Sequence, residues 1–85
     1  MNYRVIILPS AQKSLDRNPS PFLEQIETKL LALADDPRPQ GCKKLQGEDN
    51  LWRIRSGNYR IVYEINDAVL VVTAIKIGHR RDIYR

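Results

Sequence analysis

Cationic groups and groups that can move protons gather in the second half of the chain. Arg53, Arg55 and Arg60 stand close together in sequence, and the C-terminal segment adds His79, Arg80, Arg81 and Tyr84. A guanidinium fork matches phosphate oxygens bidentately, and imidazole and phenol groups transfer or position protons. Such groups suit the cleavage of RNA, through proton transfer, positioning and stabilisation of a pentacoordinate phosphorane.

The excess positive charge also lies in the second half of the chain. The net charge is +4, and residues 1–42 carry equal numbers of basic and acidic side chains, so the whole excess falls on residues 43–85. A basic half suggests an anionic partner such as nucleic acid. A solvated basic surface without a ligand would give the same composition, so charge alone does not decide between these two interpretations.

The composition argues against several classes of protein. One cysteine and one histidine exclude a disulfide within the chain and a structural zinc site. No glycine-rich phosphate loop, carboxylate pair or metal-ligand spacing is present, so we expect neither a metal nor a cofactor. No apolar run approaches the roughly 18 residues that span a bilayer, and no secretory signal is visible. We therefore expect one cytoplasmic domain over residues 1–85, without membrane contact.

The first half of the chain predicts a strand and a helical hairpin. Residues 2–8 are rich in β-branched and aromatic types and stop at a proline, which favours a strand. Two helices over roughly 10–35 follow, and an apolar stripe at helical spacing marks the second: Leu23, Ile26, Leu30, Leu33 and Ala34. Residues 37–50 contain prolines and glycines and are predicted to form a loop.

The second half predicts an antiparallel meander. Three segments with period-two patterning, Leu51–Ser56, Tyr59–Asn66 and Ala68–Ile77, are joined at Gly57-Asn58 and Asn66-Asp67, both favoured hairpin dipeptides. The predicted fold class is therefore α+β, with the helices packed on one face of the sheet.

Two-residue turns fix which residues share a face. The first turn sets Arg55 opposite Arg60 and Arg53 opposite Val62, and the second sets Tyr63 opposite Leu70. Alternation then gathers an apolar set on one face: Trp52, Ile54, Tyr59, Ile61, Tyr63, Leu70, Val72 and Ala74. The opposite face carries the three arginines, whose mutual repulsion requires either acidic neighbours or a polyanion, and their guanidinium forks suit a phosphate-binding cluster. Solvated arginines over a half-exposed sheet are the alternative.

These motifs resemble the RelE/ParE toxin superfamily of bacterial toxin–antitoxin modules. The resemblance covers almost the whole chain, in the order of its elements and in four segments: Lys44-Leu45-Gln46-Gly47, Leu51-Trp52-Arg53-Ile54-Arg55, Gly57-Asn58-Tyr59-Arg60-Ile61-Val62-Tyr63-Glu64 and Ile77-Gly78-His79-Arg80-Arg81-Asp82-Ile83-Tyr84. It implies a RelE-type mRNA interferase, which enters the ribosomal A site and cuts the messenger without metal, by attack of a ribose 2′-hydroxyl on the adjacent phosphate.

The resemblance also implies roles for individual residues. Matched by motif, the catalytic residues are Arg53, Arg55, Arg60, Arg80 and Tyr84. The best-known member has lysines at the first two of these positions, and an arginine is a poor general base. His79 is therefore the first candidate for the proton acceptor. Further basic residues are expected to contact the RNA backbone, namely Lys43, Lys44 and Arg81.

A toxin of this kind needs a partner that silences it. The resemblance implies a cognate RelB-like antitoxin, encoded adjacently, in a toxin–antitoxin hetero-oligomer. Two other interpretations stay open. The same fold serves ParE-type toxins that poison DNA gyrase, and a non-catalytic binding module of this fold would share the sequence pattern.

Overall fold

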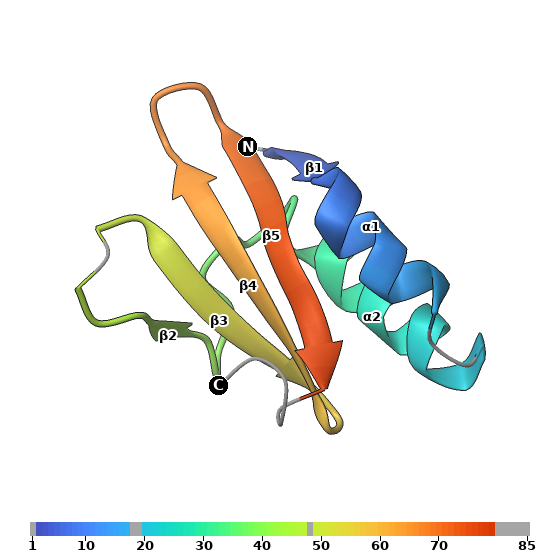
Figure 1. Ribbon diagram of the computed structural model, residues 1–85. Coiled ribbons are helices and arrows are strands. Elements are labelled where there is room, and N and C mark those ends of the chain that lie inside the picture. Colours follow the sequence, from blue (N-terminus) through green and yellow to red (C-terminus); the bar gives the residue numbers. More distant parts are fainter. Residues whose placement is uncertain (1, 18–19, 48, 80–85) are drawn as a thin grey trace.

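The computed structural model describes residues 2–17, 20–47 and 49–79 of the chain, and it has an α+β fold (Figure 1). Five strands form one sheet in the order β1-β5-β4-β3-β2, in which β1 runs parallel to β5 and the other neighbours pair antiparallel. Two helices lie beside this sheet. The bounds of the elements are β1 Arg4–Ile7, α1 Pro9–Asp16, α2 Ser20–Ala32, β2 Lys43–Lys44, β3 Leu51–Ser56, β4 Tyr59–Asn66 and β5 Val71–His79.

The two helices form the predicted hairpin and cover one face of the sheet. Pro9 occupies the start of α1, where its missing N–H costs no hydrogen bond. In α2 and the turn after it, the predicted stripe buries Ile26, Leu30 and Leu33. These side chains meet the inward-facing residues of the sheet in one core, whose sheet members are Ile54, Ile61, Tyr63, Ile65, Val72, Ala74 and Ile77. No helix among the residues described is long and apolar enough to cross a membrane.

The loop predicted over residues 37–50 contains a short strand. Lys43 and Lys44 form β2, which pairs with Arg53 and Trp52 and becomes an edge of the sheet. The pattern of prolines and glycines could not reveal this strand, because two lysines carry no hydrophobic alternation. Their partner strand supplies the hydrogen bonds that hold them in extended form.

The connection between β4 and β5 differs from the predicted two-residue turn. Asn66 pairs with Val71, so four residues form the turn and the last strand begins at Val71. The amide of Ala68 donates to the side chain of Asn66 at 3.1 Å, and Leu70 has a φ of 56°. An asparagine side chain that accepts a hydrogen bond from the amide two residues later stabilises a longer turn. The spacing of the strands in the sequence does not distinguish this turn from a two-residue hairpin. The predicted pairing of Tyr63 with Leu70 is therefore wrong.

Candidate nucleic-acid interface

The three central arginines lie on one face of the sheet. The hairpin of β3 and β4 has the predicted register, with Arg55 opposite Arg60 and Arg53 opposite Val62. Gly57 has a φ of 60° in the connecting turn, a conformation that glycine adopts without steric cost. Because paired residues share a face and neighbours along a strand alternate, these arginines lie on the face opposite the buried core.

The two lysines of β2 lie on opposite faces. Lys43 pairs with Arg53 and so belongs to the arginine face, whereas Lys44 pairs with Trp52, which packs against the core. Both lysines are exposed. Of the two lysines expected to contact RNA, the sheet brings only Lys43 to the arginines.

Basic residues outnumber acidic ones on the sheet face that the helices leave uncovered. Pairing and alternation assign six basic strand residues to this face, and Glu64 is the only acidic strand residue there. We call the six basic residues the basic face: Arg4, Lys43, Arg53, Arg55, Arg60 and Lys76. Two of the cross-strand pairs, Lys43 with Arg53 and Arg55 with Arg60, place like charges directly opposite. Each such like-charge pair destabilises a sheet by about 0.2–1 kcal/mol. A polyanion binding there would offset this cost.

Arg60 is buried on the central strand of this face, at the second residue of β4 beside the β3–β4 turn. The residue is 4% exposed, whereas Arg55 opposite it is exposed. The Arg60 Nη1 donates to the carbonyl oxygen of Tyr59 at 3.5 Å. Its other cross-strand partner is Gly78, which adds no side chain to that row. Burial places the Arg60 guanidinium in a less polar environment than that of an exposed arginine, which strengthens its interaction with neighbouring charge.

His79 lies on the other face of the sheet. It pairs with Tyr59, and the two rings meet edge to face with centroids 5.7 Å apart. Tyr59 packs against the core, so strand pairing assigns His79 to the helix-covered side. Strand pairing therefore assigns His79, the first candidate for the proton acceptor, to the face opposite the three arginines. Arg80, Arg81 and Tyr84, the other predicted residues of the tail, lie outside the described residues.

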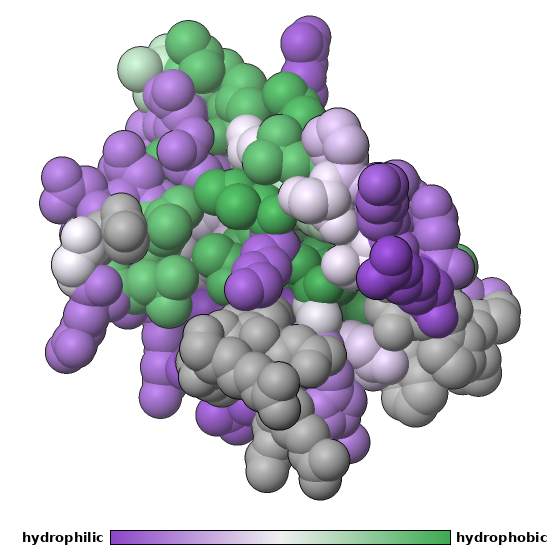
Figure 2. Space-filling model, in the orientation of Figure 1, coloured by the Kyte–Doolittle hydropathy of each residue, from purple (hydrophilic) through white to green (hydrophobic). Residues whose placement is uncertain are grey.

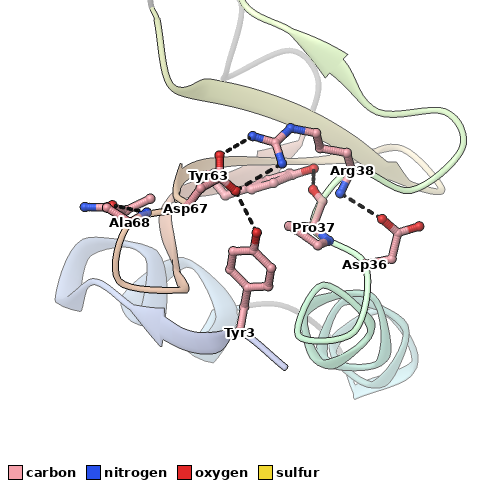
Figure 3. Close-up of polar contacts among 8 residues, drawn as sticks. Tyr3, Asp36, Pro37, Arg38, Tyr63, Asp67 and Ala68 are labelled. Atoms are coloured by element: carbon pink, nitrogen blue, oxygen red, sulfur yellow. Dashed lines mark hydrogen bonds and ion pairs between the residues drawn. The ribbon is translucent and has the colours of Figure 1, made fainter. Parts of the chain in front are cut away.

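A polar network at one end of the sheet was not anticipated from the sequence (Figure 3). The guanidinium of Arg38 donates to both carboxylate oxygens of Asp67, at 2.8 and 3.3 Å, and the Tyr3 hydroxyl donates to Asp67 at 2.6 Å. The Arg38 guanidinium also lies 5.2 Å from the centre of the Trp52 ring, within the range of a cation–π contact. Nearby, the buried hydroxyl of Tyr63 donates to the carbonyl of Pro37 at 2.8 Å.

The pKa values in this network follow from the contacts. Hydrogen bonds from Arg38 and Tyr3 hold the pKa of Asp67 below its ordinary value, and the bond to Asp67 raises the pKa of Tyr3. Burial raises the pKa of Tyr63. The network is thus built from a carboxylate, a guanidinium and neutral phenols, and it joins the chain before β1, the segment after α2 and the β4–β5 turn.

The surface combines these charges with apolar area. Figure 2, in the orientation of Figure 1, shows apolar side chains over the middle of the molecule with hydrophilic side chains around them. No group of three or more metal-ligating side chains of the His, Cys, Asp or Glu type occurs in the described part of the chain. The feature that stands out for chemistry is therefore the basic face.

Comparison with known proteins identifies the family. The family model described as "ParE toxin of type II toxin-antitoxin system, parDE" matches residues 5–84. The mRNA interferase toxin RelE of Escherichia coli K12 is 37% identical over 59 residues, which are 67% of this chain and 61% of that protein. Toxin RelG of Mycobacterium tuberculosis is 32% identical over 86 residues, with 100% of this chain and 99% of that protein covered. The matched part thus spans about three fifths of the E. coli relative.

Solved structures agree in fold. The archaeal RelE–RelB complex of Pyrococcus horikoshii contains a chain with a TM-score of 0.84 and 29% identity, covering 94% of this chain and 97% of that chain. A free E. coli RelE mutant gives a TM-score of 0.81 at 31% identity, covering 99% and 92%. Because the family model matches nearly the whole chain and the fold agrees, this chain belongs to the ParE toxin family of type II toxin–antitoxin systems, within the RelE/ParE superfamily.

Proposed function

We propose that this chain is a toxin that cleaves messenger RNA in the ribosomal A site. The observation that carries the proposal is the β3–β4 register, which gathers Arg53, Arg55 and Arg60 on the sheet face that the helices leave uncovered. The name of the E. coli relative, mRNA interferase toxin, supports the same reaction.

The proposed reaction is an internal transfer at phosphorus. The ribose 2′-oxygen attacks the adjacent phosphate, the bond between phosphorus and the 5′-oxygen of the next nucleotide breaks, and the products carry a 2′,3′-cyclic phosphate and a 5′-hydroxyl. One proton leaves the 2′-hydroxyl and one joins the departing 5′-oxygen. Negative charge builds on the phosphorane oxygens, so fixed cations beside them lower the barrier.

Arg60 is the residue that we assign to the scissile phosphate. It is 4% exposed, so its guanidinium is held in a protein environment before the substrate arrives and needs little reorganisation. Arg53 and Arg55 on the neighbouring strand then neutralise the flanking phosphate charge. Arg80 in the tail is proposed to add to this group, as the family motif implies.

Proton transfer falls to groups other than these arginines, because a guanidinium stays protonated at neutral pH. The tail residue proposed for it is Tyr84, and the Tyr84→Phe substitution tests it by removing only the hydroxyl group. His79 is tested separately, because its pairing with Tyr59 assigns it to the other face.

We also propose a RelB-like antitoxin as the partner that silences the chain. Several structures similar to this chain were solved as RelB–RelE complexes, including those from Pyrococcus horikoshii and Escherichia coli. An antitoxin that placed acidic side chains on the basic face would occupy the same groups that hold RNA phosphates. We expect the pair to form a hetero-oligomer.

Inhibition of DNA gyrase is the second candidate function. The matching family model carries the ParE name, and this favours the alternative. A gyrase poison does not need a phosphate-cleaving cluster, so the two functions predict different outcomes for the same preparation.

The test uses pure protein with programmed ribosomes, and primer extension maps the 5′ ends of the messenger. We expect cuts that depend on the ribosome and persist in EDTA. Free RNA should be a poor substrate, because the ribosome supplies positioning that is worth several kcal/mol, up to about 7–11 kcal/mol in favourable cases. Intact messenger together with inhibited supercoiling would assign the chain to the gyrase poisons, and harmless expression without the antitoxin would point to a non-catalytic module.

A further inference from the structure

A β-bulge in β5 determines on which face of the sheet Lys76 lies. Val72 and Ala74 face the core, so strict alternation along the strand would send Lys76 there as well. The register instead shifts between Tyr63, which pairs with Ala74, and Val62, which pairs with Lys76. Ile75 is the extra residue.

The consequence of the bulge is visible in burial. Beyond it Ile77 is 2% exposed and fills the core position, while Lys76 is exposed. Bulges re-aim the side chains that follow them. Here the bulge places the Lys76 ammonium group on the basic face instead of in the core.

Lys76 completes a row across four strands. Lys43 on β2 pairs with Arg53 on β3, Arg53 pairs with Val62 on β4, and Val62 pairs with Lys76 on β5. Neighbouring strands are about 4.8 Å apart, so the backbone positions at the two ends of this row are separated by roughly 14 Å. Val62 in the middle is 8% exposed and carries no charge.

Arg60 lies in the next row, two residues from Val62 along β4, and is thus a diagonal neighbour of Lys76. Diagonal neighbours in a sheet have their Cβ atoms about 7–8 Å apart, within reach of long side chains. The two lysines therefore flank the proposed cleavage position from opposite sides, Lys43 across β3 and Lys76 on β5.

We propose that Lys76 binds a backbone phosphate of single-stranded RNA next to the scissile phosphate, so that the RNA crosses the strands along the row from β5 to β2. This inference rests on the proposed function and adds a residue and a direction to it. An exposed lysine presents a compact charge on a flexible stem, which suits a phosphate and carries no base preference. Lys76 acts in binding, and the chemical step stays with the arginines.

The test compares Lys76→Ala and Lys76→Arg with the wild type in ribosome-dependent cleavage. We expect Lys76→Ala to raise KM about threefold to tenfold with kcat nearly unchanged, and Lys76→Arg to restore KM. The slope of log affinity against log salt should fall by about 0.7, the contribution of one phosphate contact on a single strand. Lys13→Ala removes an exposed lysine on α1 and serves as the matched control, with KM unchanged.

Two results would overturn the proposal. One is a Lys76→Ala protein whose KM and salt slope equal those of the control. The other is a Lys76→Ala protein that cuts normally but binds the antitoxin more weakly, since Lys76 would then serve the protein partner. Thermal unfolding of each variant shows that the fold is kept.

Failure of the proposed function is distinguishable from failure of this inference. If the wild type does not cut messenger at all, binding of a single-stranded RNA oligonucleotide is measured directly by fluorescence anisotropy across a salt series. A lower salt slope for Lys76→Ala then supports the phosphate contact, and an equal slope rejects it.

Discussion

Arg38 and Asp67 form a two-point ion pair, with the Nη2 to Oδ2 distance at 2.8 Å and the Nη1 to Oδ1 distance at 3.3 Å. Arg38 lies in the segment that leads from α2 into β2, and Asp67 lies in the β4–β5 turn. Arg38 also covers the ring of Trp52, the residue that pairs with Lys44. The ion pair thus links the segment before β2 to the β4–β5 turn, while the pairing of Lys43 with Arg53 places Lys43 on the basic face.

Replacing the carboxylate should remove a pH-dependent part of stability. The pKa of Asp67 is held below its ordinary value by Arg38, so its contribution is present above the unfolded-state pKa of about 3.9 and is lost as pH falls through the lowered folded-state pKa. We expect Asp67→Asn to lower the melting temperature at pH 7, and the difference from wild type to shrink as pH falls below about 4.

The matched control is Asp35→Asn, which changes an exposed acid after α2. Its melting temperature relative to wild type should vary much less over the same pH range. A constant difference between wild type and Asp67→Asn from pH 7 to pH 2 would show that the carboxylate charge does not stabilise the fold.

The sequence predicts the β3–β4 hairpin in full because its turn is a Gly-Asn dipeptide and its residues alternate clearly. Arg55 opposite Arg60 follows from these two local facts. The sequence also predicts that Ile26, Leu30 and Leu33 are buried on one side of a helix, because helical spacing is a local pattern that needs no tertiary information.

Features that depend on distant partners were not predictable in this way. The bulge at Ile75 arises where β5 must place Ile77 in the core while it pairs with β4, and no local residue pattern marks it. An unbroken alternation misplaces Lys76 for that reason. The pairing of β2 depends on β3, and the ion pair of Arg38 with Asp67 joins residues that are far apart in sequence.

The two adjacent lysines of β2 offer a test of the face assignment. Lys43 pairs with Arg53 on the basic face and Lys44 pairs with Trp52 on the other. We expect Lys43→Ala to raise KM for ribosome-dependent cleavage severalfold and to lower the salt slope by about 0.7, because one phosphate contact is lost. Lys44→Ala should stay within about twofold of wild type in the same assay, as a substitution without a phosphate contact. Equal losses from both substitutions would contradict the sheet register at β2.

His79 tests whether an imidazole takes the proton. Its ring contacts Tyr59 at 5.7 Å between centroids, and the pairing of the two residues assigns it to the helix-covered side. We therefore expect His79→Ala to leave the shape of the pH–rate profile of cleavage unchanged between pH 5 and 9, at most with a lower melting temperature. A general base leaves a limb in that profile at its own pKa. Disappearance of such a limb in the variant would restore His79 to the chemical step.

Arg60 is the substitution that probes the chemistry most directly, and its burial dictates the design of the experiment. At 4% exposure, Arg60→Ala removes packing as well as charge, so a loss of activity in that variant alone would not separate the two effects. Arg60→Lys keeps a positive charge and an aliphatic stem but lacks the planar fork that matches two phosphate oxygens.

We expect Arg60→Lys to retain a melting temperature near that of wild type and to lose about 100- to 1000-fold in kcat, the usual effect of removing one donor to a developing oxyanion. Single-turnover cleavage at saturating ribosome concentration measures this step without the contribution of binding. Lys13→Ala, on α1, is the control for changes in surface charge. Full activity in Arg60→Lys would mean that a single ammonium group suffices, and a loss in KM alone would move Arg60 from the scissile phosphate to a flanking one.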